Sequence, residues 1–157
     1  MLITQALLAE VAAQAAANPR RRRNRNFHTH ESAPTHRMLN ALQPDSYVRP
    51  HCHLDPAKDE SIIALRGRFG VVIFGHDGAV LSHEVIAPQG DAVGVDIAHA
   101  TFHSLVALDA DAVFFEAKAG PYVPLVEAEL APWAPAEGAP GAAAFLARLR
   151  SLFDAAR

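Results

Sequence analysis

The feature that most limits the fold is a series of short apolar runs, rich in Val, Ile and Phe, which begins near Ser46. Turn-forming segments such as GHDG at 75–78 separate these runs. The pattern predicts strands at Tyr47–His53, Glu60–Leu65, Arg68–Phe74, Val80–Ile86, Ala92–Ile97, Thr101–Leu108 and Ala112–Ala117. Closely spaced strands without intervening helices are typical of a β-sandwich or small barrel, so we predict an all-β domain.

Helical patterns flank this region. Thr4–Ala17 has the apolar period of a helix, and Thr4 can cap it. Pro34–Leu42 predicts a short second helix, and Gly141–Ala156 predicts a final amphipathic one. The chain therefore divides into a helical and basic extension that packs on the barrel (1–45), the barrel itself (46–122), and an accessory Ala/Pro-rich tail with a helix (123–157). The tail carries no recognisable chemistry.

Composition limits the class of protein further. The 157 residues fit one domain, and half of them are hydrophobic, so a core can form without disulfides or structural metal ions. The single cysteine, Cys52, excludes an internal disulfide and favours a reducing compartment. The formal charge of −3 argues against a general nucleic-acid binder. The N-terminus lacks the basic start of a signal peptide, and Glu10 and Gln14 interrupt its apolar run, so we expect a cytoplasmic protein without a membrane segment.

Two histidines one residue apart mark the candidate site. On a strand, His51 and His53 point to the same face, where two neutral imidazoles can bind one metal ion. Glu60 opens the next predicted strand, and a hairpin would return its carboxylate to the histidine pair. His103, at the start of another apolar strand, is the candidate for the fourth ligand. The alternative is an ordinary polar pair on a half-buried strand.

The spacing of these residues resembles the first motif of the cupin superfamily. In that motif His-x-His precedes a glutamate and then a glycine, and the chain keeps this order in His51, His53, Glu60 and Gly67. The gap between His53 and Glu60 holds six residues instead of three or four. Ser46 stands near the place of the opening glycine.

The second cupin motif, Pro-x-Gly-x-x-His, is retained only at its histidine. The chain has Ala98 and Ala100 in place of the two turn residues and keeps His103. This departure weakens the turn, and His99 is placed where it can intrude.

A more specific resemblance extends beyond the barrel. The runs MLNALQPDSYVRPHCH, GRFGVVIF, HSLVAL and EAKAGPY, after an Arg-rich segment leading to NFH, are similar to the WbuC-type cupin-fold metalloproteins, over 2–122. The resemblance implies a bacterial jelly-roll barrel, or double-stranded β-helix, and a link to O-antigen or other surface-polysaccharide gene sets. It implies one divalent metal ion, held by His51, His53, Glu60 and His103. By analogy with cupins that pair through their sheets, we expect a homodimer.

Five further residues are candidates for contact with a small-molecule ligand. Lys118 and Tyr122, near the end of the last predicted strand, can bind substrate or move a proton at the barrel rim. The alternative for Lys118 is a surface ion pair with Glu116. Arg49 shares the period-2 face of the histidine pair and suits a carboxylate or phosphate. Asn26 and His28 alternate along a segment that can cover the barrel mouth, or they lie on a plain surface.

The run Arg20–Arg25 is a dense basic patch with several interpretations. It can be a solvated turn, or an anion site for a phosphate or sugar nucleotide. Nucleic acid is least favoured, because the rest of the chain is acidic and offers no interleaved aromatic residues.

Two classes of function follow from the metal site. As an enzyme, the protein would use a divalent ion (iron, manganese, nickel, copper or zinc) as a Lewis acid on a small oxygen-rich sugar or sugar acid. Isomerisation and epimerisation fit such chemistry, whereas a dioxygenase would need a redox-active ion. As a non-catalytic module, the same site would bind a metabolite as a sensor or serve structurally.

Overall fold

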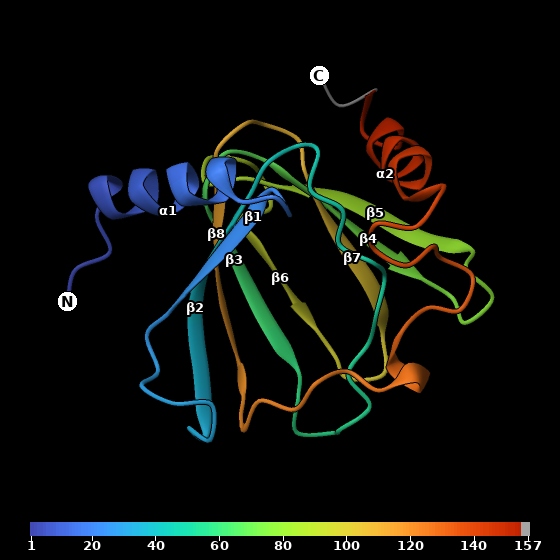
Figure 1. The fold of residues 1–157 in the computed structure, drawn as a ribbon, viewed down its shortest axis with the longest axis horizontal. Helices are drawn as coiled ribbons and strands as arrows, with labels where there is room; N and C mark the ends of the chain where they lie inside the picture. The colour runs from blue at the N-terminus through green and yellow to red at the C-terminus, as the bar shows by residue number, and fades with distance from the viewer. Residues whose placement is uncertain (155–157) are drawn as a thin grey trace.

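The computed structural model describes residues 1–154, which form two antiparallel sheets and two α-helices (Figure 1). One sheet has the strand order β1-β2-β8-β3-β6 and the other β5-β4-β7. The strands are β1 (Arg22–Asn26), β2 (Thr35–Leu42), β3 (Glu60–Arg66), β4 (Phe69–Phe74), β5 (Val80–Ile86), β6 (Gly94–Ile97), β7 (Phe102–Ala107) and β8 (Ala112–Ala119). The helices are α1 (Gln5–Ala17) and α2 (Ala142–Ser151), with a short 3-10 turn η1 at Glu127–Glu129. The predicted all-β barrel with a helix at each end is confirmed.

The interior between the sheets changes from apolar to polar along the strands. Successive side chains of a strand point to opposite faces, so Ala112, Phe114, Glu116 and Lys118 of β8 all face inward. The first two belong to the apolar cluster between the sheets, whereas the last two pair with charged neighbours. That cluster consists of Leu42, Ile62, Ala64, Phe69, Val71, Ile86, Ile97, Leu105, Ala107, Ala112 and Phe114. The candidate site lies at the polar end.

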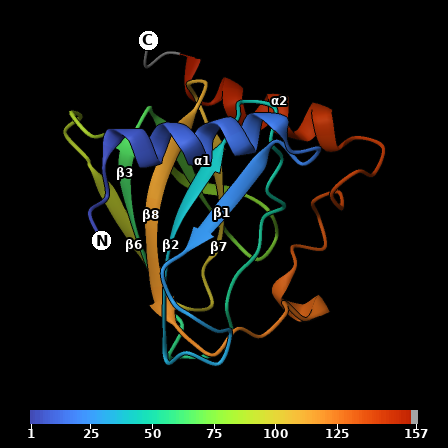
Figure 2. The same ribbon diagram turned by 60° about the vertical axis from the view of Figure 1, so that its left-hand side comes forward.

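Helix α1 covers the outer face of the five-stranded sheet, where it lies across β1, β2 and β8 (Figure 2). Thr4 caps it as predicted, because its Oγ1 accepts a hydrogen bond from the N–H of Leu7 at 3.2 Å. The buried face of the helix packs on the sheet through Leu8, Val11, Ala12 and Ala15, which contact a cluster containing Leu39, Ala41 and Val113. Neither helix of the described chain is long and apolar enough to cross a membrane.

Helix α2 and the chain before it cover the outer face of the three-stranded sheet. Phe145, Leu149 and Phe153 form one buried cluster with Val72 of β4 and Val106 of β7. The tail therefore completes the hydrophobic core and is not merely accessory. The helix ends at Ser151, and the last positions of the predicted helix, 155–156, lie outside the described residues.

The predicted short helix at Pro34–Leu42 is wrong, because Thr35–Leu42 forms β2. This strand pairs with β1 on one side and with β8 on the other. Hydrogen bonding to two neighbours and burial on both faces outweigh a weak local helical pattern. Part of the basic segment forms β1, so the five-stranded sheet begins before the predicted barrel boundary at residue 46.

The predicted strand at Tyr47–His53 does not form as a continuous strand. His51 makes an isolated antiparallel bridge to His103 of β7 and a second one to Leu130 of the tail. Pro50 has no N–H to donate and a fixed φ, so it interrupts a regular ladder here. The other predicted strands are confirmed, with ends that shift by two residues at most.

Replacing Leu149 by alanine tests whether the tail belongs to the core. The side chain is 2% exposed, so its truncation should leave a cavity and reduce the free energy of unfolding by about 2–5 kcal/mol. Ala144→Ser, at an exposed position of the same helix, is the matched control and should change stability by less than about 0.5 kcal/mol. Urea unfolding measures both. Equal stability of the two variants would contradict the contribution of Leu149 to the core.

Candidate metal centre

His51 and His53 lie on a segment that is held from both sides. The N–H of His51 donates to the carbonyl of His103 in β7 at 3.1 Å, and the N–H of Cys52 donates to the carbonyl of Glu129 at 2.9 Å. Cys52 is buried in the cluster that Phe145 and Leu149 of the tail form with Val72 and Val106. The histidines on either side of Cys52 therefore face the opposite way, towards the barrel interior. Their ring centroids are 5.5 Å apart. The alternation expected from the sequence therefore survives without a continuous strand.

Glu60, the first residue of β3, is the buried centre of the cluster. Its Oε1 lies 2.8 Å from Nε2 of His53, and its Oε2 lies 3.1 Å from Nε2 of His103. The rings of His51 and His103 are 4.6 Å apart between centroids. Nζ of Lys118, which is the partner of Glu60 on β8, lies 2.7 Å from Oε1. The structure thus brings all four predicted ligand residues together.

Backbone carbonyls orient two of the histidines. Nδ1 of His51 bonds to the carbonyl of Arg49 at 3.0 Å, and Nδ1 of His103 bonds to the carbonyl of Thr101 at 2.9 Å. A carbonyl oxygen can only accept, so Nδ1 carries a proton in both rings. In His51, Nε2 is then the atom that is available to a metal ion, in the arrangement that is usual for metal-binding histidines. Nε2 of His103 lies 3.1 Å from Oε2 of Glu60, and it would have to exchange this contact for the ion.

The electrostatics of the cluster favour an ionised carboxylate and a neutral imidazole. Burial alone would raise the pKa of Glu60, but hydrogen bonds with two histidines and the charge of Lys118 lower it overall. Burial lowers the pKa of His51 to about 3, so this ring is neutral at physiological pH, which is the form that binds metals. Burial would lower the pKa of Lys118, but the carboxylates of Glu116 and Glu60 raise it overall.

A second carboxylate lies on the other side of Lys118. Oε1 of Glu116 is 2.8 Å from Nζ of Lys118, and its Oε2 accepts a hydrogen bond from the amide of Asn40 at 2.6 Å. Burial raises the pKa of Glu116. The surface ion pair that was the alternative for Lys118 is wrong, because the contact with Glu116 lies within the barrel.

The donor set fits a divalent ion. Ligand atoms of His51, His53 and Glu60 all lie within 4.8 Å of one another. His103 approaches the same carboxylate through Nε2. Imidazole nitrogens with one carboxylate suit iron, manganese, nickel, copper or zinc. Because the cluster contains no cysteine, it does not resemble a thiolate-rich zinc or iron–sulfur site. A site with at most four protein ligands can leave a coordination position for water or a substrate oxygen.

A cavity of about 180 Å³ opens beside the histidine pair. It is lined by His36, His51, His53, Lys58, Lys118, Ala119, Pro121, Tyr122, Val123 and Leu125. Sequence reasoning missed His36, because the pattern of its segment predicts a helix. It also missed Lys58, which lies in the loop between His53 and Glu60. That loop is longer than the spacing of the cupin motif, and this extra length is the feature of the sequence that could have drawn attention to Lys58.

The turn before His103 keeps its place without the glycine of the cupin motif. Ala100 has a φ of 58°, in the left-handed region that favours glycine. Its N–H donates to the carbonyl of His53 at 2.6 Å, which ties this turn to the segment of the histidine pair. His99 is exposed and its Nδ1 lies 2.8 Å from a carboxylate oxygen of Asp59, so it does not intrude into the cluster.

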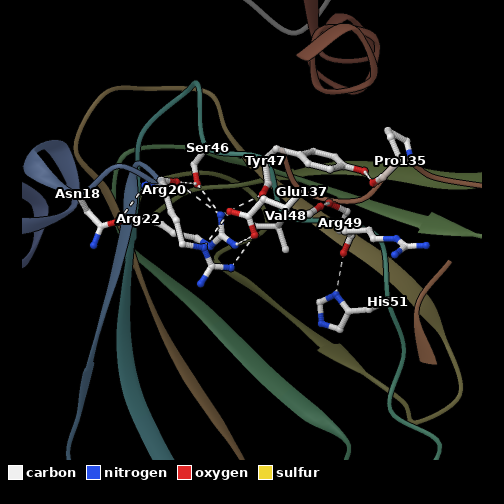
Figure 3. A network of polar contacts seen from close by, with 11 residues as sticks. Asn18, Arg20, Arg22, Ser46, Tyr47, Val48, Arg49, His51, Pro135 and Glu137 are labelled. Atoms are coloured by element: carbon white, nitrogen blue, oxygen red, sulfur yellow. Dashed lines mark hydrogen bonds and ion pairs between the residues drawn. The ribbon is translucent and has the colours of Figure 1, made fainter. Parts of the chain in front are cut away.

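Of the remaining residues that were predicted to contact a ligand, Tyr122 lines the cavity, whereas Arg49, His28 and Asn26 do not. Tyr122 lines the cavity and is 55% exposed. The guanidinium of Arg49 points away from His51 and donates to a backbone carbonyl of the tail at 2.7 Å (Figure 3). His28 stacks on His36 with 3.9 Å between ring centroids, and therefore lies behind the cavity wall. Asn26 is exposed and is not part of the cavity lining.

The arginine run fastens the tail to the segment that leads to His51 (Figure 3). The carboxylate of Glu137 accepts hydrogen bonds from Arg20 at 2.6 Å and from Arg22 at 2.7 Å. Arg22 also donates to the carbonyl of Tyr47 at 3.0 Å, and the Tyr47 hydroxyl donates to a tail carbonyl at 2.9 Å. Further ion pairs are Arg21–Asp45 and Arg25–Glu10. Most of the run is therefore engaged within the chain, which favours a structural role over a free anion site.

Comparisons with known proteins agree with this fold. A family model described as "Domain of unknown function (DUF6016)" matches residues 3–86, and no curated protein matches the sequence. TT1209 from Thermus thermophilus aligns at 18% identity over 75% of this chain and 95% of that chain, with a TM-score of 0.54. KdgF from Halomonas sp. aligns at 18% identity over 68% and 84%, with a TM-score of 0.52. A cupin superfamily protein, DSY2733 from Desulfitobacterium hafniense, aligns at 8% identity over 62% and 76%, with a TM-score of 0.49. Because their sequence identity is only 18%, TT1209 and KdgF support the assignment of the fold but not a function.

Neutralising Glu137 tests the connection between the tail and the arginine run. The hydrogen bond with Arg20 and the charge of Arg22 lower the pKa of Glu137 from its ordinary value of 4.5 to about 2. A folded-state pKa below the unfolded value adds stability that is complete above pH 4.5 and is lost as pH falls towards 2. Because the pair is partly exposed, we expect Glu137→Gln to cost only about 1 kcal/mol at pH 7 in low salt.

The difference between parent and Glu137→Gln should shrink as the pH of a urea titration is lowered from 5 to about 2. Glu127→Gln, at an exposed position of the same tail, is the control. A difference that does not depend on pH would contradict the ion-pair origin of the effect.

Proposed function

We propose that this chain, which belongs to the DUF6016 family, is a metal-dependent enzyme that acts on a small oxygen-rich metabolite. The observation that carries the proposal is that the cluster of His51, His53, Glu60 and His103 lies beside a cavity, which His51 and His53 line. A purely structural metal site needs no such cavity. The same cavity also receives Lys118, a charged group that chemistry at the metal can use.

The residues of the chain have distinct roles in this proposal. The three histidines and Glu60 hold the ion, which supplies Lewis-acid polarisation of a ligand oxygen. Lys118 is an ammonium group at neutral pH, because two carboxylates raise its pKa. It therefore serves as a fixed positive charge beside a ligand oxygen on which negative charge develops, and not as a base. Tyr122, at the exposed side of the cavity, contacts the ligand as it enters.

The substrate class and the setting extend this proposal. A sugar or sugar acid offers neighbouring oxygens to the ion, so isomerisation or epimerisation is the favoured reaction class, and oxygenation would require iron. The similarity to WbuC-type proteins supports a place in bacterial surface-polysaccharide metabolism. We include in the proposal a homodimer in the cytoplasm.

A non-catalytic sensor is the second candidate, because one observation favours it. Both oxygens of Glu60 already contact protein groups, namely His53, His103 and Lys118, which favours a closed site. If the ion takes four protein ligands and keeps no open position, the site would report on a metal or metabolite without turnover.

The Lys118→Met variant separates the two candidates. Protein loaded with iron(II), manganese, nickel, copper or zinc is incubated with a panel of sugars and sugar acids, and products are detected by NMR. For an enzyme, Lys118→Met should lower kcat by about 100-fold or more, because the local positive charge is lost.

Metal content is measured in the same preparations, so that a loss of the ion is not mistaken for a loss of chemistry. Lys118→Arg, which keeps the charge, is the matched variant and should retain metal. Binding of a sugar acid without turnover by any metal form would favour the sensor. Unchanged kcat in Lys118→Met would remove Lys118 from the chemistry.

A further inference from the structure

The chain uses lysine only at this cavity. It has 14 lysine and arginine residues, of which Lys58 and Lys118 are the two lysines. One comes from the loop between His53 and Glu60 and the other from β8, yet both line the same 180 Å³ cavity. Lysine presents a compact charge on a flexible stem, which can turn towards a ligand, whereas arginine fixes a planar fork. Both lysines of the chain therefore contribute to the wall of one cavity.

The two ammonium groups differ in their partners. Lys118 lies between Glu60 and Glu116, so its charge is neutralised within the barrel. Lys58 is 8% exposed, and its Nζ donates one hydrogen bond, to the carbonyl of Pro121 at 3.0 Å. Within residues 1–154 no carboxylate forms an ion pair with it.

The nearest acidic influence on Lys58 does not replace an ion pair. Its charge helps to lower the pKa of Glu129, but the Glu129 carboxylate is held by the backbone N–H groups of Leu54 at 2.9 Å and Val126 at 3.0 Å. An ammonium has three donors, and a buried charge is unfavourable unless it is paired. Lys58 therefore lacks the counter-charge that its burial calls for.

We propose that Lys58 anchors a carboxylate group of the ligand. No acidic side chain lines the described cavity, so nothing repels an anion that enters it. An anionic group at Lys58 would supply the missing partner, while a hydroxyl or carbonyl oxygen of the same molecule lies towards the histidine pair. The inference narrows the proposed function, on which it rests, from sugars in general to small hydroxy acids.

The size and walls of the cavity limit the ligand further. A volume of 180 Å³ is below the range of about 300–1,000 Å³ that is usual for drug-sized ligands. Val123 and Leu125 provide apolar contact on one side. A three- or four-carbon hydroxy acid fits these limits better than a polysaccharide chain.

NMR of the lysine side chains tests the proposal directly. In protein made with ¹⁵N-lysine, only two Nζ signals arise, one from each lysine. D-glycerate and glycerol form a matched probe pair, because glycerate has a carboxylate where glycerol has a hydroxymethyl group. We expect D-glycerate to shift the Lys58 signal saturably in the zinc-loaded protein, and glycerol to bind about tenfold or more weakly.

Two variants keep the test independent of folding and of metal binding. Lys58→Met preserves the apolar stem and should weaken glycerate binding about tenfold or more, with unchanged zinc content. Lys58→Arg restores the charge and should recover part of the affinity. A Lys58 shift by glycerate in protein that binds no zinc would support the anchor while contradicting the metal centre.

Three results would overturn the anchor. Zinc binding with equal affinity for glycerate and glycerol would show that Lys58 does not select for charge. Unaltered glycerate binding in a folded Lys58→Met would show that another group holds the anion. Inorganic phosphate binding more tightly than glycerate at Lys58 would assign a phosphate group in place of the carboxylate.

Discussion

The buried carboxylate of Glu60 is the constraint on which the rest of the site depends. An ionised carboxylate away from water costs several kcal/mol unless cations and hydrogen-bond donors surround it. Here His53, His103 and Lys118 do so, at 2.7–3.1 Å. A divalent ion would satisfy the same charge with the same residues. The polar end of the barrel is therefore organised around the negative charge of Glu60. Burial of the apolar cluster at the other end offsets the free-energy cost of burying that charge.

The parts of the chain outside the sheets serve this end of the barrel. The segment that carries the histidine pair is not a regular strand, so β7 on one side and the tail on the other must hold it. Glu137 and the arginine run tie the tail to the residues just before that segment. The loop that lengthens the cupin spacing contributes Lys58 to the cavity. Departures from a simple barrel thus cluster where a ligand would bind.

Local pattern was sufficient for most strands and for the four clustered residues, because period 2 and motif spacing are properties of the sequence itself. It failed at β2, where pairing with β1 and β8 decides the structure. It also failed for Arg49, whose side chain turns to the tail, and for Lys58, whose burial depends on a distant loop at Pro121. Such contacts between remote segments cannot be inferred from spacing alone.

Metal content tests the central claim most directly. Parent protein, the His51→Ala/His103→Ala double variant and the control His99→Ala are each exposed to iron(II), manganese, nickel, copper and zinc, and the bound ions are counted by mass spectrometry. We predict about one ion per chain in the parent and in His99→Ala, because His99 lies outside the cluster. The double variant should remain folded and lose the ion. A parent that takes up no ion, or a double variant that keeps it, would contradict the account.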